Sequence, residues 1–517
     1  MAPIKKIQIR KNYAPWLSDT TKELIKERNE AQKVAFTSKK LEDWEKFKKL
    51  RNNLTSRLKH EKENWQQRKL ENCDSNSGKI WDSVKGWLNW TSSGAPTQIF
   101  YNGKLENKSL SIAECMNKFF IEKIKTIQTG MLQIIGTDPL ATLKALMKNR
   151  SCVFKMKAVH PDTVDKIIST MKNSKASGLD NIDTYILKLA KQEIVPAITH
   201  IVNLSIEQGV FPEKFKYAKV IPLHKKDDWL NPKNFRPVSI LSNLSKIVER
   251  AVFLQLIEYL NEKNLLHPNH HGFRSNVNTT TALIQMYDSW IEALERGDVT
   301  VVCLLDMSAA FDLVDFSLLL RKMKLYGLDD NALKWMENYL TGRKQCVCID
   351  GILSTFLNVD TGVPQGSILG PLLYVIFTND LPEIIHDHGP VDNPPNEHSY
   401  NVHCIECGGL CCFADDSTYS ISGKTANEIS QKIATKYEII SEYMQLNRLK
   451  LNDDKTHLMV MMTDQLKRKR PDFVVNLNTG TDLIKPTGNE KMLGGIISSN
   501  LKWTCLLYTS DAARRRG

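Results

Sequence analysis

Three aspartates in two separate stretches of the sequence could jointly bind metal ions. Asp415 and Asp416 are adjacent within Leu410–Ser422, where strand-forming apolar residues flank a polar, turn-prone centre. This pattern predicts a β-hairpin with both carboxylates at its tip. A nearly unbroken apolar run, typical of a strand buried on both faces, starts at Val299 and ends on Asp306.

A carboxylate at the end of a buried strand is costly unless a cation compensates it. If this strand end meets the hairpin tip, three carboxylates converge and repel one another unless a divalent ion lies among them. Oxygen ligands with room for water and phosphate suit Mg²⁺. Two such ions can activate a nucleophilic oxygen and stabilise a leaving oxygen in phosphoryl or nucleotidyl transfer. The alternatives are a salt-bridged structural cluster and an ordinary surface turn.

Composition narrows the class of protein. The 517 residues are 42% hydrophobic, which predicts two to four domains. The net charge is +12, and Met1–Asn72 carries 19 lysines and arginines against 10 acidic residues, which fits a polyanionic partner or a merely soluble basic helix. No apolar run is long enough to span a bilayer, so we expect no membrane partner. The 11 cysteines form no repeating frame, which favours a reducing intracellular setting, the nucleus or the cytoplasm.

Helices and short strands that could position the aspartates alternate after Val153. Before that point, apolar residues at near-helical spacing predict one long helix over Ser18–Leu70, capped by Ser18 or Asp19. Gly362–Pro382 predicts a glycine-rich turn followed by an apolar helix. Further helices are predicted over Leu110–Ile127, His160–Asn173, Thr184–Lys191, Phe316–Tyr326 and Glu428–Asn447, and strands over Lys219–His224, Cys346–Ile349 and Thr355–Val359.

Five motifs follow one another in the order LDMSAAFD, GVPQGSILGPLL, FADD, LNDDKT and LGGIISSNLKW. In this order they resemble the reverse transcriptase of non-LTR (LINE-like) retrotransposons, and SGLDNI, NFRPVSIL and HGFRS are similar to that family's finger-region blocks. The resemblance covers about Ala158–Trp503. It implies an α+β fold with a right-hand polymerase palm and fingers, behind a basic helical N-terminal extension. It also implies an RNA-directed DNA polymerase that adds dNTPs to a primer 3′-OH on an RNA template.

The resemblance assigns roles to the acidic cluster. Asp306, Asp415 and, less directly, Asp416 would hold two Mg²⁺ ions, with Mn²⁺ as an alternative, and the Met307 carbonyl would be a further ligand. Lys455 in LNDDKT resembles the family's lysine near the pyrophosphate leaving group, where it could donate a proton or neutralise charge. A solvated lysine is the alternative at that position.

The resemblance also assigns substrate contacts. Phe311 is similar to a steric gate that blocks a 2′-hydroxyl, the alternative being a core aromatic. Arg236 resembles the finger arginine that contacts the triphosphate, or is a surface arginine ahead of a proline turn. Gln365 would lie beside the nucleotide sugar and template base, and Gly366 would let the backbone approach the substrate closely. Arg274 would contact the template or the neighbouring fingers.

Domain boundaries are expected as follows: residues 1–95 are a basic helical N-terminal extension, 96–157 a linker and helical segment, 158–297 the fingers, 298–465 the palm, 466–503 the end of the palm and start of the thumb, and 504–517 a non-native or artefactual tail. The thumb is therefore expected to be mostly missing. The palm includes a helical segment, 362–382, and a Cys/His-containing insert, 386–412. Cys404 and Cys407 in that insert have zinc-ligand types, but incidental thiols in a surface loop are the favoured interpretation.

The expected partners are an RNA template, a DNA primer and dNTPs. Two other functions stay open from the sequence. One is another palm polymerase, either an RNA-dependent RNA polymerase or a group II intron-type enzyme. The other is a catalytically inactive, truncated RNA-binding remnant. The oligomeric state is not predicted.

Overall fold

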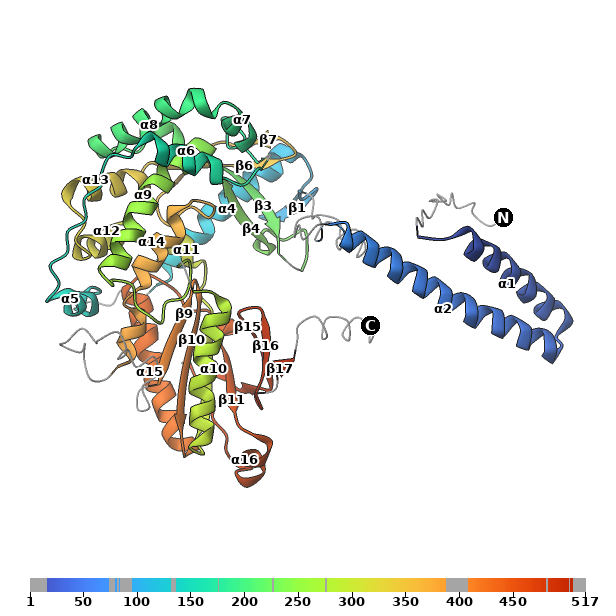
Figure 1. The fold of residues 1–517 in the computed structure, drawn as a ribbon. Helices are drawn as coiled ribbons and strands as arrows, with labels where there is room; N and C mark the ends of the chain where they lie inside the picture. Colours follow the sequence, from blue (N-terminus) through green and yellow to red (C-terminus); the bar gives the residue numbers. More distant parts are fainter. Residues whose placement is uncertain are drawn as a thin grey trace. The chain divides into compact units, whose positions relative to one another are not determined.

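A computed structural model describes residues 16–73, 80, 83, 95–131, 136–174, 176–225, 227–274, 277–386, 408–479, 482–501, 503 and 504. The chain divides into two compact units, Met1–Gly94 and Ala95–Gly517 (Figure 1). Each unit is described by itself.

The first unit is a helical hairpin of α1 (Asp19–Ser38) and α2 (Leu41–Glu71). The prediction of one continuous helix is therefore wrong, because the chain reverses at Lys39, which has a φ of 54°. Ser18 caps α1 as predicted, accepting a hydrogen bond from the Thr21 amide. The Thr21 hydroxyl in turn donates to Glu61 of α2 at 2.8 Å. These contacts between the two helices outweigh the local preference for a single helix.

The second unit is built around a five-stranded sheet in the order β14-β11-β5-β10-β9. The strand β5 lies at its centre and is almost entirely buried, as the apolar run predicts. Both of its neighbours run antiparallel to it. The strands are β5 (Val299–Leu305), β9 (Gly409–Phe413), β10 (Asp416–Gly423), β11 (His457–Met461) and β14 (Pro486–Thr487).

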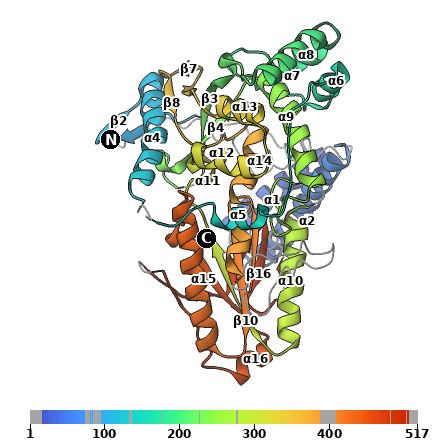
Figure 2. The same cartoon turned by 90° about the vertical axis from the view of Figure 1, so that its left-hand side faces the viewer.

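Two helices cover opposite faces of this sheet (Figure 2). Alternate residues of β5 point to opposite faces. Val301 and Cys303 belong to the core that includes α15 (Ala426–Leu446), whereas Val302 packs with α10 (Thr279–Glu295). The end of the sheet where the aspartates lie is therefore packed between two apolar layers.

A second sheet has the order β4-β3-β6-β7, with β8 paired to β6. Its strands are β3 (Tyr217–His224), β4 (Phe235–Ile240), β6 (Arg343–Ile349), β7 (Ile352–Leu353) and β8 (Leu357–Val359). The predicted pairing of the strands near Cys346 and Val359 is confirmed, since β6 and β8 are antiparallel. Helix α4 (Ser109–Thr129) packs on this sheet through Ile112 and Met116.

The apolar helix predicted after the glycine-rich turn is α14 (Leu369–Thr378), which is buried almost throughout. The buried carboxylate of Glu249 accepts hydrogen bonds from the Ile368 and Leu369 amides at its N-terminus. The other helices are α5 (Ala141–Met147), α6 (Pro161–Thr170), α7 (Thr184–Leu189), α8 (Lys191–Gln208), α9 (Asn243–Glu262), α11 (Ala310–Leu313), α12 (Phe316–Leu325), α13 (Asp330–Leu340) and α16 (Asp464–Lys469), with 3₁₀ turns η1 (Glu213–Lys216), η2 (Pro232–Asn234), η3 (Leu381–Ile385) and η4 (Asp453–Lys455).

Three small sheets complete the described elements. They contain β1 (Ile99–Tyr101) with β2 (Lys104–Glu106), β12 (Leu477–Asn478) with β13 (Leu483–Ile484), and β15 (Asn489–Met492), β16 (Gly495–Ser498) and β17 (Trp503–Thr504).

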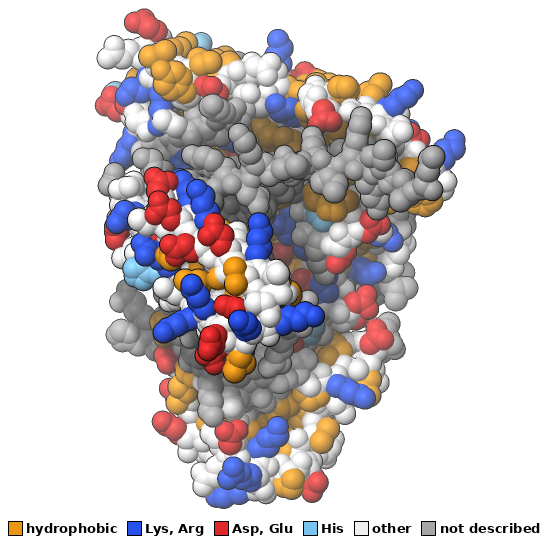
Figure 3. Space-filling view, turned by 90° about the vertical axis from the view of Figure 1, so that its right-hand side faces the viewer, with side chains coloured by type: hydrophobic (Ala, Val, Ile, Leu, Met, Phe, Trp, Pro, Cys, Tyr) orange, Lys and Arg blue, Asp and Glu red, His pale blue; other side chains and the backbone are white. Residues whose placement is uncertain are grey.

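Helix α16 carries the exposed side chains of Lys467, Arg468 and Lys469, and Figure 3 shows basic side chains at this lower end of the molecule. Among the described helices, none combines the length and apolar character that crossing a bilayer needs.

Candidate active site

The central strand β5 brings Asp306 to one end of its sheet. The Asn452 amide donates to the Asp306 carbonyl at 2.9 Å, which fixes the backbone just beyond the strand. On the side chain, Lys455 Nζ donates to Asp306 Oδ2 at 2.8 Å and Asn452 Nδ2 donates to the same oxygen at 3.3 Å. The segment that precedes β11 therefore supplies both polar partners of this carboxylate.

Asp415 and Asp416 lie at the tip of the hairpin formed by β9 and β10, as the sequence predicts. Phe413 and Asp416 form the last pair of the hairpin, leaving a two-residue turn. Ala414, the first residue of this turn, has a φ of 56°. Tight hairpin turns that match strand twist need such a positive φ at their first central position.

The register of β10 against β5 brings this turn to Asp306. Ser417 lies opposite Leu305 at the end of the ladder, so Asp416 comes opposite Asp306 one residue further on. Although the Asp416 side chain is exposed, partial desolvation raises its pKa, and repulsion from Asp415 and then from Asp306 raises it further. The structure thus brings the three carboxylates to one end of the sheet.

This donor set fits a hard divalent cation. All three groups are carboxylates, and their mutual repulsion is what a cation would relieve. Within the residues that the structure describes, no three His, Cys, Asp or Glu side chains are close enough to enclose an ion. Mg²⁺ commonly binds through one or two carboxylates together with water and substrate phosphates, so an open set of oxygens suits it.

Met307 and Phe311 lie against the same tyrosine. The Met307 side chain is buried, and the Tyr374 hydroxyl donates to its Sδ at 3.1 Å. The half-buried Phe311 ring stacks on Tyr374 with ring centroids 4.7 Å apart. Phe273 meets Phe311 edge-on at 6.0 Å. The Phe311 ring is therefore held on two sides.

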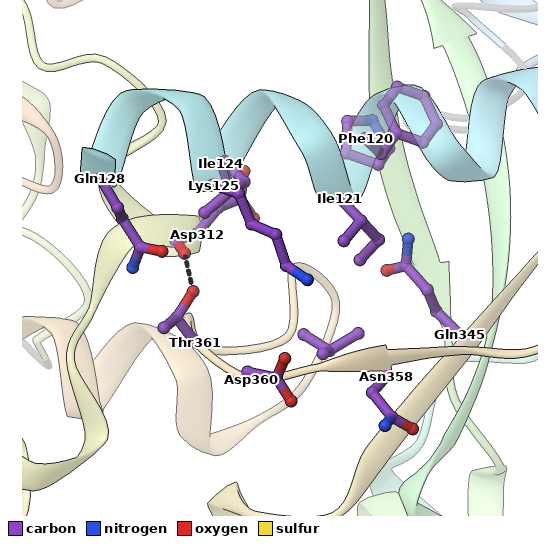
Figure 4. Close-up of a pocket in the computed structure, with 12 residues that line it drawn as sticks. Phe120, Ile121, Ile124, Lys125, Gln128, Asp312, Gln345, Asn358, Asp360 and Thr361 are labelled. Atoms are coloured by element: carbon purple, nitrogen blue, oxygen red, sulfur yellow. Dashed lines mark hydrogen bonds between the residues drawn. The ribbon is translucent and has the colours of Figure 1, made fainter. Parts of the chain in front are cut away.

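Gln365 is anchored to the residue that follows Phe311. Its Nε2 donates to both carboxylate oxygens of Asp312 at 2.9 Å. The Asp312 carbonyl accepts a hydrogen bond from the Thr361 hydroxyl at 3.3 Å, and Figure 4 shows both residues at a pocket beside α4. The contacts join α11 to the loop before α14.

Gly366 permits a close approach of two backbones. It has a φ of 122°, and a Cβ built on it would lie 2.4 Å from the Ser239 carbonyl oxygen. Next to it, the Ser239 amide donates to the Gln365 carbonyl at 3.0 Å. Only glycine fits both the backbone conformation and the space at this position.

The two predicted arginines occupy different settings. Arg236 on β4 is exposed. Burial raises the pKa of Asp312 to about 6, and the Gln365 hydrogen bonds and the charges of Lys123 and Arg236 oppose this rise. Arg274 instead turns into its own loop, where Nη1 donates to the carbonyls of His267 and His270 at 2.7 and 3.1 Å. No described contact links either arginine to the three aspartates.

Sequence reasoning missed Asn452, Asp312 and Gly272 as parts of this site. Asn452 lies in LNDDKT and Asp312 in LDMSAAFD. Their polar side chains within these motifs are the signal that could have identified them. A Cβ on Gly272 would lie 2.4 Å from the Ala414 nitrogen. The HGFRS loop therefore packs directly on the aspartate turn, a long-range contact without a local sequence signal.

The predicted Cys/His insert lies mainly outside the described residues, since 387–407 are not described. This includes Cys404 and Cys407, so zinc binding by the insert stays a prediction. Cys411 and Cys412 belong to β9 and are buried there. Burial raises the pKa of both thiols, which disfavours the thiolate form that binds metals.

Residues 223–494 match the family Reverse transcriptase (RNA-dependent DNA polymerase). Over 308 residues the chain is 28% identical to the probable RNA-directed DNA polymerase from transposon BS of Drosophila melanogaster, an alignment that covers 58% of this chain and 32% of that protein. It is 28% identical over 298 residues to the RNA-directed DNA polymerase from mobile element jockey of Drosophila funebris, covering 57% and 30%. The probable RNA-directed DNA polymerase from transposon X-element of Drosophila melanogaster is 25% identical over 371 residues, covering 72% and 38%. The chain thus spans about a third of the length of these curated relatives.

Proposed function

The chain belongs to the reverse transcriptase family, of the non-LTR (LINE-like) type, and from this premise we propose that it carries out RNA-directed DNA synthesis. The proposed reaction adds a dNTP to the 3′-OH of a DNA primer paired to an RNA template and releases pyrophosphate. The observation that carries the proposal is the meeting of the β5 end with the β9–β10 turn, which brings Asp306, Asp415 and Asp416 together.

In this proposal the three aspartates hold two Mg²⁺ or Mn²⁺ ions, with the Met307 carbonyl as a further ligand. When bound, such ions make a 3′-hydroxyl more acidic and neutralise a triphosphate. Lys455 already contacts Asp306 at 2.8 Å. From there it could turn toward the pyrophosphate and neutralise its charge or give it a proton.

The neighbouring residues are proposed to select and hold the nucleotide. Phe311, fixed by Tyr374, would exclude a 2′-hydroxyl by its bulk. Gln365 and Gly366 would bring the loop before α14 to the sugar and base, and Arg236 would contact the triphosphate through its planar fork of donors. The exposure of Arg236 leaves it free to meet a ligand.

The proposed division of the chain follows the central sheet. Residues 298–465 contain most of the central sheet and would form the palm, whereas 158–297 would form the fingers. Residues 1–95 would be a basic extension that contacts nucleic-acid phosphates, 96–157 a connecting helical segment, and 466–503 the end of the palm and the start of the thumb. The strand ladder from β5 to β10 supports the palm assignment.

Extension of a DNA primer on an RNA template with Mg²⁺ and dNTPs tests the proposal. We expect Asp306→Asn to lower the rate by roughly a thousandfold, because metal ions supply several kcal/mol of charge stabilisation. Asp454→Asn, an exposed carboxylate beside Lys455, is the matched control and should extend like wild type. Equal extension by wild type and Asp306→Asn would overturn the proposal. RNA binding without extension by any variant would indicate an inactive RNA-binding protein.

A further inference from the structure

Two cations lie side by side at the start of two paired strands of the second sheet. Tyr217 of β3 is paired with Lys344 of β6 in a parallel ladder. Lys216, the last residue of η1, and Arg343, the first residue of β6, each come one residue earlier. Both line the same pocket, and the charge of Arg343 acts on Lys216. Lys216 and Arg343 form one wall of that pocket together with Ala218, Gln345 and Val359.

The opposite wall comes from the proposed active site. It contains Asp312 and the loop from Thr361 to Gln365. The carboxylate of Asp312 faces the pocket but is already bound through both oxygens by Gln365 Nε2. The positive charges that act on the Asp312 carboxylate are those of Lys123 and Arg236, not those of Lys216 or Arg343.

Arg343 has unused hydrogen-bonding capacity. Its side chain is buried, with the residue only 3% exposed, and the guanidinium carbon lies 4.3 Å from the centre of the Tyr339 ring. Nε donates to the Tyr339 carbonyl at 2.7 Å. Nη1 and Nη2 are buried and have no hydrogen-bond partner among the described residues. Burying donors of a charged group without partners is strongly unfavourable.

Lys216 increases the local excess of positive charge. It is 8% exposed, and burial followed by the neighbouring charge of Arg343 lowers its pKa, against which Glu213 acts. No ion pair joins Lys216 or Arg343 to an acid within the described part of the chain. The buried acid Glu249 accepts hydrogen bonds from Tyr339 and from the start of α14.

We propose that this pocket, called the basic pocket, binds an oxyanion of the phosphate class between Arg343 and Lys216. The two free nitrogens of a guanidinium match two oxygens of a phosphate group, and the lysine supplies a second charge. The phosphate would come either from a phosphodiester of single-stranded RNA or from a free anion such as inorganic phosphate. The proposal goes beyond DNA synthesis and requires neither a metal ion, a primer nor turnover.

Titration of the full chain with inorganic phosphate tests the site, with KCl used to keep the ionic strength constant and no divalent metal present. Calorimetry and thermal unfolding should both show binding to wild type. We expect Lys216→Met to weaken phosphate binding roughly tenfold, as the loss of one charge-assisted contact predicts. Lys214→Met, in the same 3₁₀ turn but exposed, should bind phosphate like wild type.

Arg343→Lys provides a second variant, which keeps the charge but loses the planar fork and should also bind phosphate at least tenfold more weakly. Circular dichroism checks that each variant is folded, and Lys216→Met decides the matter if Arg343→Lys does not fold. Absence of phosphate binding by wild type, or equal binding by wild type and Lys216→Met, would overturn the proposal.

Binding of a short single-stranded RNA then separates the two sources. If the strand provides the phosphate, Lys216→Met binds RNA more weakly than Lys214→Met does, and free phosphate competes with the RNA. If only a free anion enters, the two variants bind RNA equally while their affinities for phosphate still differ. Both outcomes support the oxyanion site and identify its ligand.

Discussion

The side-chain nitrogen of Gln365 lies 2.9 Å from each carboxylate oxygen of Asp312. This contact ties the loop before α14 to the short helix α11, which also carries Phe311. Burial raises the pKa of Asp312 to about 6, while the Gln365 hydrogen bonds and the charges of Lys123 and Arg236 oppose the rise. Asp312, which follows Phe311 and binds Gln365, is therefore a carboxylate that titrates near neutral pH.

Asp312→Asn should remove a pH-dependent loss of stability. The pKa of Asp312 is about 6 in the folded protein against 3.8 for the free group, so the folded state binds more protons between these values. The free energy of unfolding therefore falls as the pH rises from about 4 to about 6, and the loss is complete above that range. We expect the variant to match wild type near pH 4 and to exceed it at pH 7 by about 3 kcal/mol, measured by urea unfolding.

Asp360→Asn is the matched control, because Asp360 is exposed and lines the pocket beside α4 that Asp312 also lines (Figure 4). It should follow the wild-type profile at every pH. A constant difference between Asp312→Asn and wild type from pH 4 to pH 7 would show that the charge of Asp312 is not the cause.

Lys455→Met should strengthen metal binding and weaken turnover. Lys455 Nζ occupies Asp306 Oδ2 at 2.8 Å, so it competes with an ion for that oxygen. The two side chains are 48% and 33% exposed, and such a pair contributes at most about 1 kcal/mol. We expect Mn²⁺ to bind the substrate-free variant up to about fivefold more tightly, measured by electron paramagnetic resonance.

The same variant should extend primers about a hundredfold more slowly, since a charged group near the leaving pyrophosphate is lost. Lys450→Met is the control, because Lys450 is exposed on the same segment and has no side-chain contact with Asp306 among the described residues. Unchanged Mn²⁺ affinity in Lys455→Met would mean that the contact between Lys455 and Asp306 does not compete with metal binding.

The parts of the site that could be predicted from the sequence are those with a local pattern. The apolar run of β5 indicates a buried strand, and the Asp415–Asp416 turn has the composition of a hairpin. Their meeting follows from strand pairing, which the order of the motifs made predictable by resemblance. The break at Lys39 was not predictable from spacing, because contacts between α1 and α2, such as that of Thr21 with Glu61, decide it.

Contacts between distant residues account for the rest. Asp312 and Gln365 are 53 residues apart, and neither of their motifs predicts the hydrogen bond between them. The same holds for the basic pocket, where the parallel pairing of β3 with β6 places Lys216 beside Arg343. Periodicity indicates which face of a strand is buried, but not which strand lies next to it.

Phe311→Ala should relax the exclusion of ribonucleotides. The stack on Tyr374 at 4.7 Å holds the ring in one position, so its bulk can act as a fixed barrier. We expect the ratio of kcat/KM for dNTP to that for rNTP to fall by roughly 10- to 100-fold, the range that a hydrophobic pocket achieves by size. Primer extension with single nucleotides measures this ratio. Phe273→Ala removes the edge-on neighbour of Phe311 and serves as the control that should keep most of the selectivity.

Gly366→Ala should disrupt the loop that carries Gln365. Gly366 has a φ of 122°, and a methyl group there would lie 2.4 Å from the Ser239 carbonyl oxygen. Gly494→Ala is the matched control, because Gly494 has a φ of 90° but no atom within 4 Å of the added carbon. Both variants carry backbone strain, and only the first adds a clash, so we expect Gly366→Ala to lower the free energy of unfolding by about 2 kcal/mol more. Equal urea midpoints for the two variants would show that the loop before α14 does not rest on β4 as closely as the Gly366–Ser239 contact requires.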